Sequence, residues 1–198
     1  MQVEKLPLDA IRAQVENCQA CALCETRTNI VFGDGDPHAR VLIVGEAPGK
    51  NEDLQGKPFV GAAGKFLDEL LEEAGLKREE VFIANVLKCR PPSNRNPQAD
   101  EIEACAPFLR EQTQSIDPWI IVTMGNFATQ FILRTGTGIT RLRGTQQTGR
   151  FVVLPVFHPA AAIYDRSKRD VLLEDFRQVG ALVRARMAQE QDKDDSEE

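Results

Sequence analysis

Four runs of mainly apolar residues, each the length of a buried strand, constrain the fold of this 198-residue chain most strongly. They are residues 40–44, 81–87, 119–124 and 151–157, and a proline inside the last run weakens its strand pattern. Segments whose apolar residues recur at helical spacing lie between and after these runs. This alternation predicts an α/β fold in which helices wrap a parallel sheet.

The helical segments are marked by apolar periodicity and by residues that start or stop a helix. They are residues 8–18, 66–74, 96–109, 125–133 and 172–183. Gly75 is placed to end the second segment, and Asn96 with Pro97 forms an N-cap and first-position pair for the third. Residues 25–39 carry turn residues and are expected to be irregular.

The length favours one domain, which we place at residues 1–188. Residues 189–198 carry six acidic residues, one basic residue and no apolar residue, so we expect a disordered acidic tail. Without this tail the chain has 23 basic and 24 acidic residues, and the net charge of −6 is mainly that of the tail. The body is therefore nearly neutral.

Basic residues gather in three places in the body. Residues 87–98 and 133–150 contain arginines or lysines and no acidic residue, and Arg166, Lys168 and Arg169 form a third group. These segments could follow the phosphates of a nucleic acid, or they could be solvated loops. No apolar stretch resembles a signal peptide or approaches membrane-spanning length. We expect a cytoplasmic monomer that does not bind membranes.

Five cysteines form a pattern that disulfide chemistry does not explain. Cys18 and Cys21 make a C-x2-C pair, which Cys24 extends, and Cys89 and Cys105 are separated by fifteen residues. A split set of this kind in a chain without a secretory signal more often binds metal than forms disulfides. The spacing leaves zinc, an iron–sulfur cluster and unrelated buried thiols as alternatives.

The predicted strands deliver polar residues to one edge of the sheet. Glu46 follows the first strand, Asn85 lies near the end of the second, and His158 follows the fourth. Ligands of open α/β sheets bind beyond the carboxyl ends of the strands. Each residue also has a structural reading: Asn85 could bond a neighbouring loop, and His158 could be an ordinary buried histidine. Residues 45–50 (GEAPGK) fail the P-loop pattern in spacing and in lacking Ser or Thr after the lysine.

Taken in order, the motifs resemble the family 4 uracil-DNA glycosylases, the iron–sulfur branch of the uracil-DNA glycosylase superfamily. The matching stretches run from Cys18 to about Arg169. They are residues 44–49 (VGEAPG) with Glu52 and Asp53, 56–64 (GKPFVGAAG), 85–95 (NVLKCRPPSNR), 142–144 (LRG) and 158–160 (HPA). The resemblance implies a three-layer α/β/α sandwich on a four-stranded parallel sheet. It also implies hydrolysis of the N-glycosidic bond of deoxyuridine in single- or double-stranded DNA.

The resemblance assigns roles to residues of this chain. Cys18, Cys21, Cys89 and Cys105 match the ligands of a structural 4Fe–4S cluster, which leaves Cys24 unassigned. Phe59, otherwise readable as a plug in the core, would stack on a flipped uracil, and Asn85 would bond the N3–H and O4 edge of the base. His158 and the backbone of the 45–49 loop, including Gly45 and Ala47, would stabilise the leaving uracil anion. Glu46 would position or activate water and stabilise the cationic sugar.

The residues expected to contact DNA include one departure from the family. Arg90, Arg95 and Arg143 lie in loops that would hold phosphates. Relatives usually carry a Tyr or similar residue, leucines and an arginine after His-Pro-Ala, where this chain has residues 161–166 (AAIYDR). Ile163 and Tyr164 are the candidates for the wedge that fills the gap left by the flipped base.

Three alternatives remain. A relative that traps the abasic sugar covalently needs a histidine-bearing insertion, and residues 90–104 contain no histidine. A non-catalytic Fe–S or zinc module that binds nucleic acid, or a redox protein, is a different class. The C-x3-C-P continuation typical of ferredoxins is absent. Excision of hypoxanthine or xanthine besides uracil is left open.

Overall fold

The computed structural model describes residues 5–144 and 149–197. A five-stranded sheet has the order β1-β3-β2-β4-β5. The strands are β1 (Asp34–Gly35), β2 (Val41–Gly45), β3 (Phe82–Asn85), β4 (Ile120–Met124) and β5 (Val152–Val156). Strands β2 to β5 are parallel, and only β1 pairs antiparallel within this sheet. The parallel four-stranded sheet predicted from the sequence is confirmed, with β1 added at one edge.

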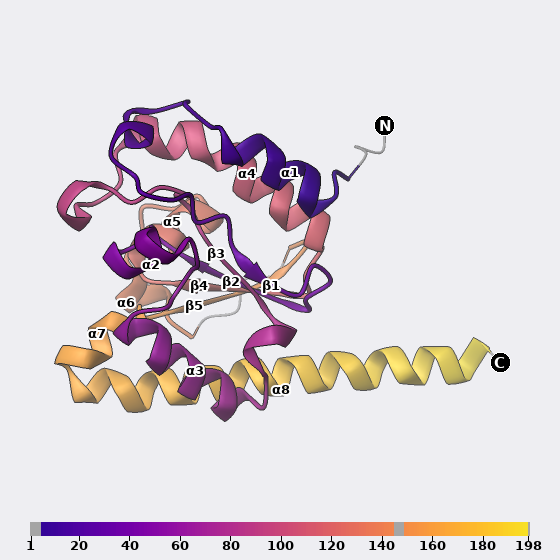
Figure 1. Ribbon diagram of the computed structural model, residues 1–198. Helices are drawn as coiled ribbons and strands as arrows, with labels where there is room; N and C mark the ends of the chain where they lie inside the picture. The colour runs from indigo at the N-terminus through magenta and orange to yellow at the C-terminus, as the bar shows by residue number, and fades with distance from the viewer. Residues whose placement is uncertain (1–4, 145–148, 198) are drawn as a thin grey trace.

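Helices cover both faces of the sheet (Figure 1). They are α1 (Leu8–Glu16), α2 (Lys50–Gln55), α3 (Ala62–Ala74), α4 (Ala99–Ile116), α5 (Asn126–Leu133), α6 (Ile139–Leu142), α7 (Pro159–Tyr164) and α8 (Arg166–Glu197). Short 3-10 turns are η1 (Ala22–Glu25), η2 (Arg78–Glu80) and η3 (Pro92–Asn94). Helices α1, α4 and α5 pack on one face, and α3, α7 and α8 pack on the other. The α/β/α sandwich is therefore confirmed.

Alternating residues of each strand feed two separate cores. In β2, Val41 and Ile43 pack toward α3 and α8, whereas Leu42 and Val44 pack toward α1 and α4. All five residues of β2 are buried, which explains why the sequence shows a continuous apolar run instead of an alternating one.

The structure corrects two details near the predicted site. Helix α4 begins at Ala99 with Gln98 as its N-cap, not at Asn96 and Pro97, because the Glu101 carboxylate accepts a hydrogen bond from the Gln98 backbone N–H at 2.9 Å. Helix α1 ends at Glu16, so Cys18 lies just beyond the helix instead of closing it. Strand β1 lacks any apolar signal because its two residues are Asp and Gly.

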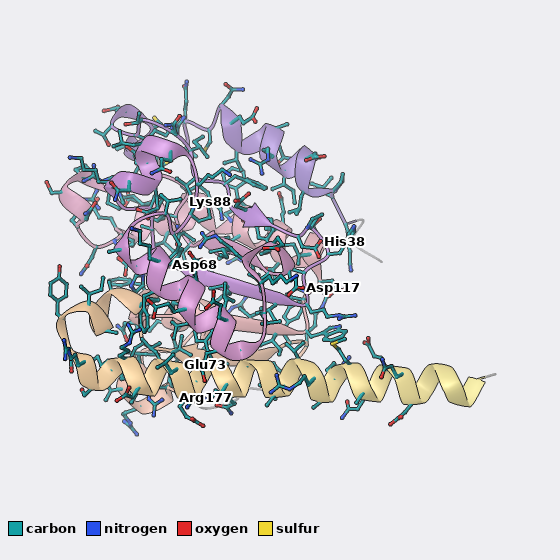
Figure 2. All side chains as sticks on the ribbon, turned by 60° about the horizontal axis from the view of Figure 1, so that its bottom comes forward. His38, Asp68, Glu73, Lys88, Asp117 and Arg177 are labelled. Carbon is teal, nitrogen blue, oxygen red and sulfur yellow. The ribbon has the colours of Figure 1, made fainter. Side chains whose placement is uncertain are left out.

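The C-terminal helix differs from the disordered tail that the composition predicts. In the structure α8 continues through residues 189–197 and projects past the body of the protein (Figure 1). Its first half is held to α3 by ion pairs, including one between Arg177 and Glu73 at 2.5 Å, and Figure 2 shows these two side chains together. No helix among the described residues is long and apolar enough to cross a membrane.

The chain connections open a crevice at the carboxyl edge of the sheet. After β2 the chain runs toward α3 on one face, and after the neighbouring β3 it runs toward α4 on the other. Strands that diverge in this way leave space between the loops that follow them. The residues after β2, β3 and β5 meet at this edge.

Candidate active site and cysteine site

A cavity of about 390 Å³ lies at this edge of the sheet. Its walls come from the loops after β2, β3 and β5 and from the turn before α3. The lining residues are Glu46, Ala47, Pro48, Gly49, Glu52, Phe59, Ala63, Asn85, Pro91, Asn94, Arg95, His158 and Ala160. The structure therefore brings together the predicted Glu46, Phe59, Asn85 and His158, which are distant in the sequence.

Asn85 presents an unused acceptor at the floor of the site. Its side chain is 2% exposed, and its Oδ1 has no hydrogen-bond partner among the described residues. A buried amide oxygen without a partner costs free energy, so it is typical of a site completed by a ligand. Gly45 makes room for it, because a Cβ at this position would lie 2.3 Å from Asn85 Oδ1 and 2.8 Å from the Phe59 ring.

Phe59 forms an aromatic wall of the cavity. Its ring centroid lies 5.7 Å from that of His158, with 29° between the ring planes. The Phe59 backbone has a φ of +50°, in the left-handed region that residues other than glycine rarely occupy. Strained conformations of this kind persist only where surrounding contacts hold them, and they cluster at functional sites.

His158 is a neutral histidine with a defined tautomer. It is the N-cap of α7, and its Nδ1 accepts a hydrogen bond from the Ala160 backbone N–H at 3.1 Å. Burial lowers the pKa of His158 to about 4. The imidazole is therefore uncharged near neutral pH, and because Nδ1 is an acceptor, the proton is on Nε2. Gly125, at φ +86°, lets β4 end close to this ring.

Glu46 follows β2 directly and is half-buried at the cavity wall. Its backbone carbonyl accepts a hydrogen bond from Leu87 N at 3.0 Å, which continues the β2–β3 pairing past the strand ends. Burial raises the pKa of the Glu46 carboxyl above its ordinary value. The site thus combines a carboxylate, an imidazole donor and an amide around one aromatic wall.

The arginines predicted to contact DNA are mostly engaged inside the protein. Arg95 lines the cavity, but its Nη1 and Nη2 donate to the two carboxylate oxygens of Glu101, at 2.9 and 2.5 Å. Arg143 binds the buried Asp175 at 2.6 Å and does not line the cavity.

Arg90 lies outside the cavity and donates from Nε to the neutral Asn94 side chain at 2.7 Å. The wedge candidates also lie outside it, on α7: the exposed fraction is 48% for Ile163 and 92% for Tyr164.

Two residues that line the cavity, Glu52 and Asn94, were not predicted as site residues from the sequence. Glu52 accepts hydrogen bonds from the backbone N–H groups of Val60 and Gly61, at 3.0 and 2.9 Å. Asn94 follows Ser93 in the turn after Cys89, and both residues have positive φ angles of 54°. Both lie in the quoted motifs, but nothing in their residue type signalled a place in the cavity.

The cysteines gather in a second, separate pocket under α4. All five line it, together with apolar residues that include Leu23, Leu87 and Phe108. Within the described residues, no three or more ligands are close enough to hold a single metal ion. The pocket shares no lining residue with the cavity that contains Glu46.

Hydrogen-bond donors point at two of the sulfurs. The Lys88 backbone N–H donates to Cys105 Sγ at 3.2 Å, and Arg27 donates to Cys89 Sγ at 3.4 Å. Burial raises the pKa of Cys21, of Cys89 and of Cys105, the last to about 11. Thiols in such surroundings need positive charge nearby, such as a metal, before they become thiolates.

Lys88 lies between the two sites. It is 1% exposed, and its Nζ donates to the Asn85 backbone carbonyl at 2.8 Å and to Gln112 Oε1 at 2.6 Å. Burial lowers the pKa of Lys88 to about 8. Figure 2 shows Lys88 inside the body, whereas His38 and Asp117 lie at its periphery.

Known proteins resemble this chain over most of its length. Residues 32–179 match the family model of the uracil DNA glycosylase superfamily. The chain is 46% identical over 186 residues to the type-4 uracil-DNA glycosylase of Sulfurisphaera tokodaii, covering 89% of this chain and 84% of the relative. For the type-4 enzyme of Archaeoglobus fulgidus the identity is 45%, with coverage of 88% and 92%.

The type-4 uracil-DNA glycosylase of Thermotoga maritima is 41% identical, with coverage of 89% of this chain and 95% of the relative. The chain belongs to the uracil DNA glycosylase superfamily and, within it, to the type-4 uracil-DNA glycosylases.

Proposed function

We propose that this protein removes uracil from DNA by hydrolysing its N-glycosidic bond, which releases free uracil and leaves an abasic site. One observation carries the proposal: Asn85 Oδ1, which has no hydrogen-bond partner in the described part of the chain, lies in a cavity that also holds Phe59 and the Nε2–H of His158. A base within a duplex cannot reach such a cavity, so the nucleotide must be flipped out of the stack.

Asn85 would select the base. Its Oδ1 accepts a hydrogen bond from uracil N3–H, and its amide nitrogen donates to O4. Cytosine offers an acceptor at N3 and a donor at N4, so each contact would meet a group of the same kind. A mismatch that leaves buried polar groups unpaired discriminates by roughly 10⁴-fold.

His158 would stabilise the leaving group. As the glycosidic bond breaks, negative charge develops on the uracil, and the neutral imidazole can donate its Nε2–H to the uracil oxygen. Backbone N–H groups of residues 45–49 would add to this stabilisation. Preorganised donors of this type account for about 10²- to 10³-fold in rate when one is removed.

Glu46 would act on the other side of the bond. As a carboxylate it stabilises the positive charge that develops on the sugar, and it orients the water that attacks the anomeric carbon. The raised pKa of Glu46 is consistent with a desolvated position beside the reacting atoms.

The protein surface suggests how the DNA strand is held. Arg90 bonds a neutral side chain, so its positive charge stays available to a phosphate, whereas the charges of Arg95 and Arg143 are balanced by carboxylates. We assign Arg95 and Arg143 to holding the loops that contact DNA, with Arg90 on the phosphate. The exposed Ile163 and Tyr164 would fill the gap that the flipped base leaves.

We infer that Cys18, Cys21, Cys89 and Cys105 hold a structural 4Fe–4S cluster. An all-cysteine donor set in an apolar pocket with N–H donors to sulfur suits such a cluster. When bound, such a cluster would cross-link the segment between α1 and η1, the loop after β3 and α4, and Cys24, which lies in η1, is the fifth thiol.

The experiment is incubation of the purified protein with uracil-containing oligonucleotides, single- and double-stranded, followed by alkaline cleavage. Strand cleavage at the uracil position, with release of free uracil, is expected. Tight binding to uracil-containing DNA without release would favour a non-catalytic module instead. A protein–DNA adduct that survives denaturation would favour the covalent relative. Visible absorption of the same sample distinguishes an iron–sulfur cluster from colourless zinc.

A further inference from the structure

Two charged side chains form hydrogen bonds with the backbone around Phe59. The carboxylate of Glu52, on α2, accepts hydrogen bonds from the N–H groups of Val60 and Gly61, at 3.0 and 2.9 Å. The guanidinium of Arg78, in η2, donates from Nη2 to the carbonyls of Pro58 and Phe59, at 2.7 and 3.0 Å. Four consecutive residues are thus bound through their backbone, with Phe59 among them.

Arg78 is itself fixed in place. Its Nη1 donates to Asp68 Oδ1, on α3, at 2.8 Å, and the Arg78 side chain is 30% exposed. Arg78 does not line the cavity that contains Phe59. Any influence of Arg78 on a base in that cavity must therefore pass through the backbone that it binds.

The hydrogen bonds from Glu52 and Arg78 hold a strained backbone conformation. Phe59 has a φ of +50°, which an unrestrained phenylalanine avoids. Gly64, on α3, lies so close that a Cβ there would be 1.8 Å from the Phe59 carbonyl oxygen. The turn is therefore pressed against α3, and the backbone bonds from Glu52 and Arg78 offset the cost of the left-handed φ.

We propose that Arg78, together with Glu52, is a positioning residue that holds the Phe59 ring in the orientation that stacks on the flipped base. The proposal rests on the proposed stacking role of Phe59. Without Arg78 the turn relaxes toward negative φ, and the ring leaves the plane that faces Asn85 and His158. Strain of this kind corresponds to a population shift of about five- to a hundredfold.

The kinetic consequence is specific. Stacking is present both in the bound substrate and in the transition state, so its loss weakens binding of both about equally. Replacement Arg78→Met should raise KM for uracil-containing single-stranded DNA about tenfold and change kcat little. Inhibition by free uracil should weaken by a similar factor, because the product uses the same ring.

The test is a double-mutant cycle with Phe59→Ala. If Arg78 acts through the ring, Arg78→Met raises KM about tenfold in the parent protein but less than about twofold in the Phe59→Ala background. Thermal stability, by contrast, should fall equally in both backgrounds. Arg177→Met, which removes an exposed arginine bound to Glu73, is the matched control and should leave KM unchanged.

The outcomes separate the two proposals. An equal KM effect of Arg78→Met in both backgrounds, or none in the parent, overturns the positioning role while the stacking role of Phe59 stands. If Phe59→Ala itself leaves KM and uracil inhibition unchanged, the stacking role fails and the positioning role fails with it. Should Arg78→Met not fold, Arg78→Lys carries the same cycle, with a smaller rise in KM expected because the ammonium keeps one donor near the carbonyls.

Discussion

The candidate active-site cavity and the cysteine pocket both draw residues from the chain at the end of β3 and just after it, yet their polar groups are arranged in opposite ways. Asn85 belongs to the first and Cys89 to the second, four residues later. In the cavity the Asn85 Oδ1 lacks a partner among the described residues, and Phe59 is strained. In the cysteine pocket two sulfurs receive N–H donors, and apolar side chains surround them.

The difference indicates where chemistry and where stability reside. Unsatisfied groups and strained backbone lower the stability of the free protein and are retained where a ligand or transition state completes them. Buried thiols with hydrogen-bond donors need no substrate to be accommodated. We therefore propose that the cavity carries the catalysis and that the cysteine pocket has a supporting role, as a cross-link between segments.

The largest effect is expected at His158. Replacement His158→Ala should lower the single-turnover rate of uracil release about 10²- to 10³-fold, because a preorganised donor to the leaving anion is lost. The fold should persist, as checked by circular dichroism. His38→Ala, at an exposed histidine on the periphery (Figure 2), is the control and should react at the parent rate. Equal rates for the two variants would contradict the assignment.

Asn85 should come next. Asn85→Asp replaces the amide donor by a second acceptor, so uracil O4 loses its partner and faces a carboxylate. We expect kcat/KM on uracil to fall about hundredfold, with a smaller or no loss on cytosine. The ratio of kcat/KM on uracil to kcat/KM on cytosine should therefore decrease. Gln114→Glu adds the same negative charge at an exposed position of α4 and controls for the change in net charge. An unchanged uracil-to-cytosine ratio would refute base selection by Asn85.

The pH profile distinguishes Glu46 from His158. Burial raises the pKa of Glu46 above its ordinary value, whereas the pKa of His158 is lowered to about 4. In the proposed mechanism, activity requires the Glu46 carboxylate and neutral His158. The rate should therefore be full above the Glu46 pKa and fall as the pH drops through it, while His158 is still neutral. Rates measured between about pH 4.5 and pH 8 should show this acid limb.

In Glu46→Gln the acid limb should disappear, and the rate at neutral pH should be lower, by roughly tenfold or more. A limb that survives unchanged in this variant would mean that another group controls the profile.

The free energy of unfolding should also depend on pH through His158. Its folded pKa lies below its unfolded value of about 6.5, so the stability it contributes is present above that value and is lost as the pH falls toward about 4.

The smallest effect tests the count of ligands in the cysteine pocket. Cys24→Ser should leave the visible absorption, the iron content and the thermal midpoint close to those of the parent, because the other four cysteines suffice. Loss of iron or of colour in this variant would mean that Cys24 is a ligand and that one of the other four is not.

The sequence predicted the elements that a simple rule connects to function. Continuous apolar runs predicted the parallel strands, and parallel strands bring their carboxyl ends to one edge, so Glu46, Asn85 and His158 could be expected to converge. The cavity confirms this convergence. Motif resemblance added Phe59, which no strand end would have indicated.

The sequence could not predict which charges are already paired. Arg95 and Arg143 are predicted phosphate ligands in acid-free segments, but the structure pairs each with a helical carboxylate, Glu101 on α4 and Asp175 on α8. Asp175 is 32 residues from Arg143, and Glu101 lies just beyond the acid-free segment that contains Arg95, so the run of basic residues alone reveals neither pair. The contact of Arg78 with the turn at Phe59 was not predictable either, because Arg78 binds backbone carbonyls, which every residue possesses.

The most direct test of the contrast between the two pockets is the rate of uracil release by Cys105→Ser, measured in a single turnover and divided by the folded fraction. Loss of the cross-link should lower the thermal midpoint by about 10 °C, since several kcal/mol of metal-linked folding free energy are lost. Below that midpoint, the rate per folded molecule should stay within about tenfold of the parent. A folded Cys105→Ser protein as slow as His158→Ala would contradict the supporting role of the cysteine pocket.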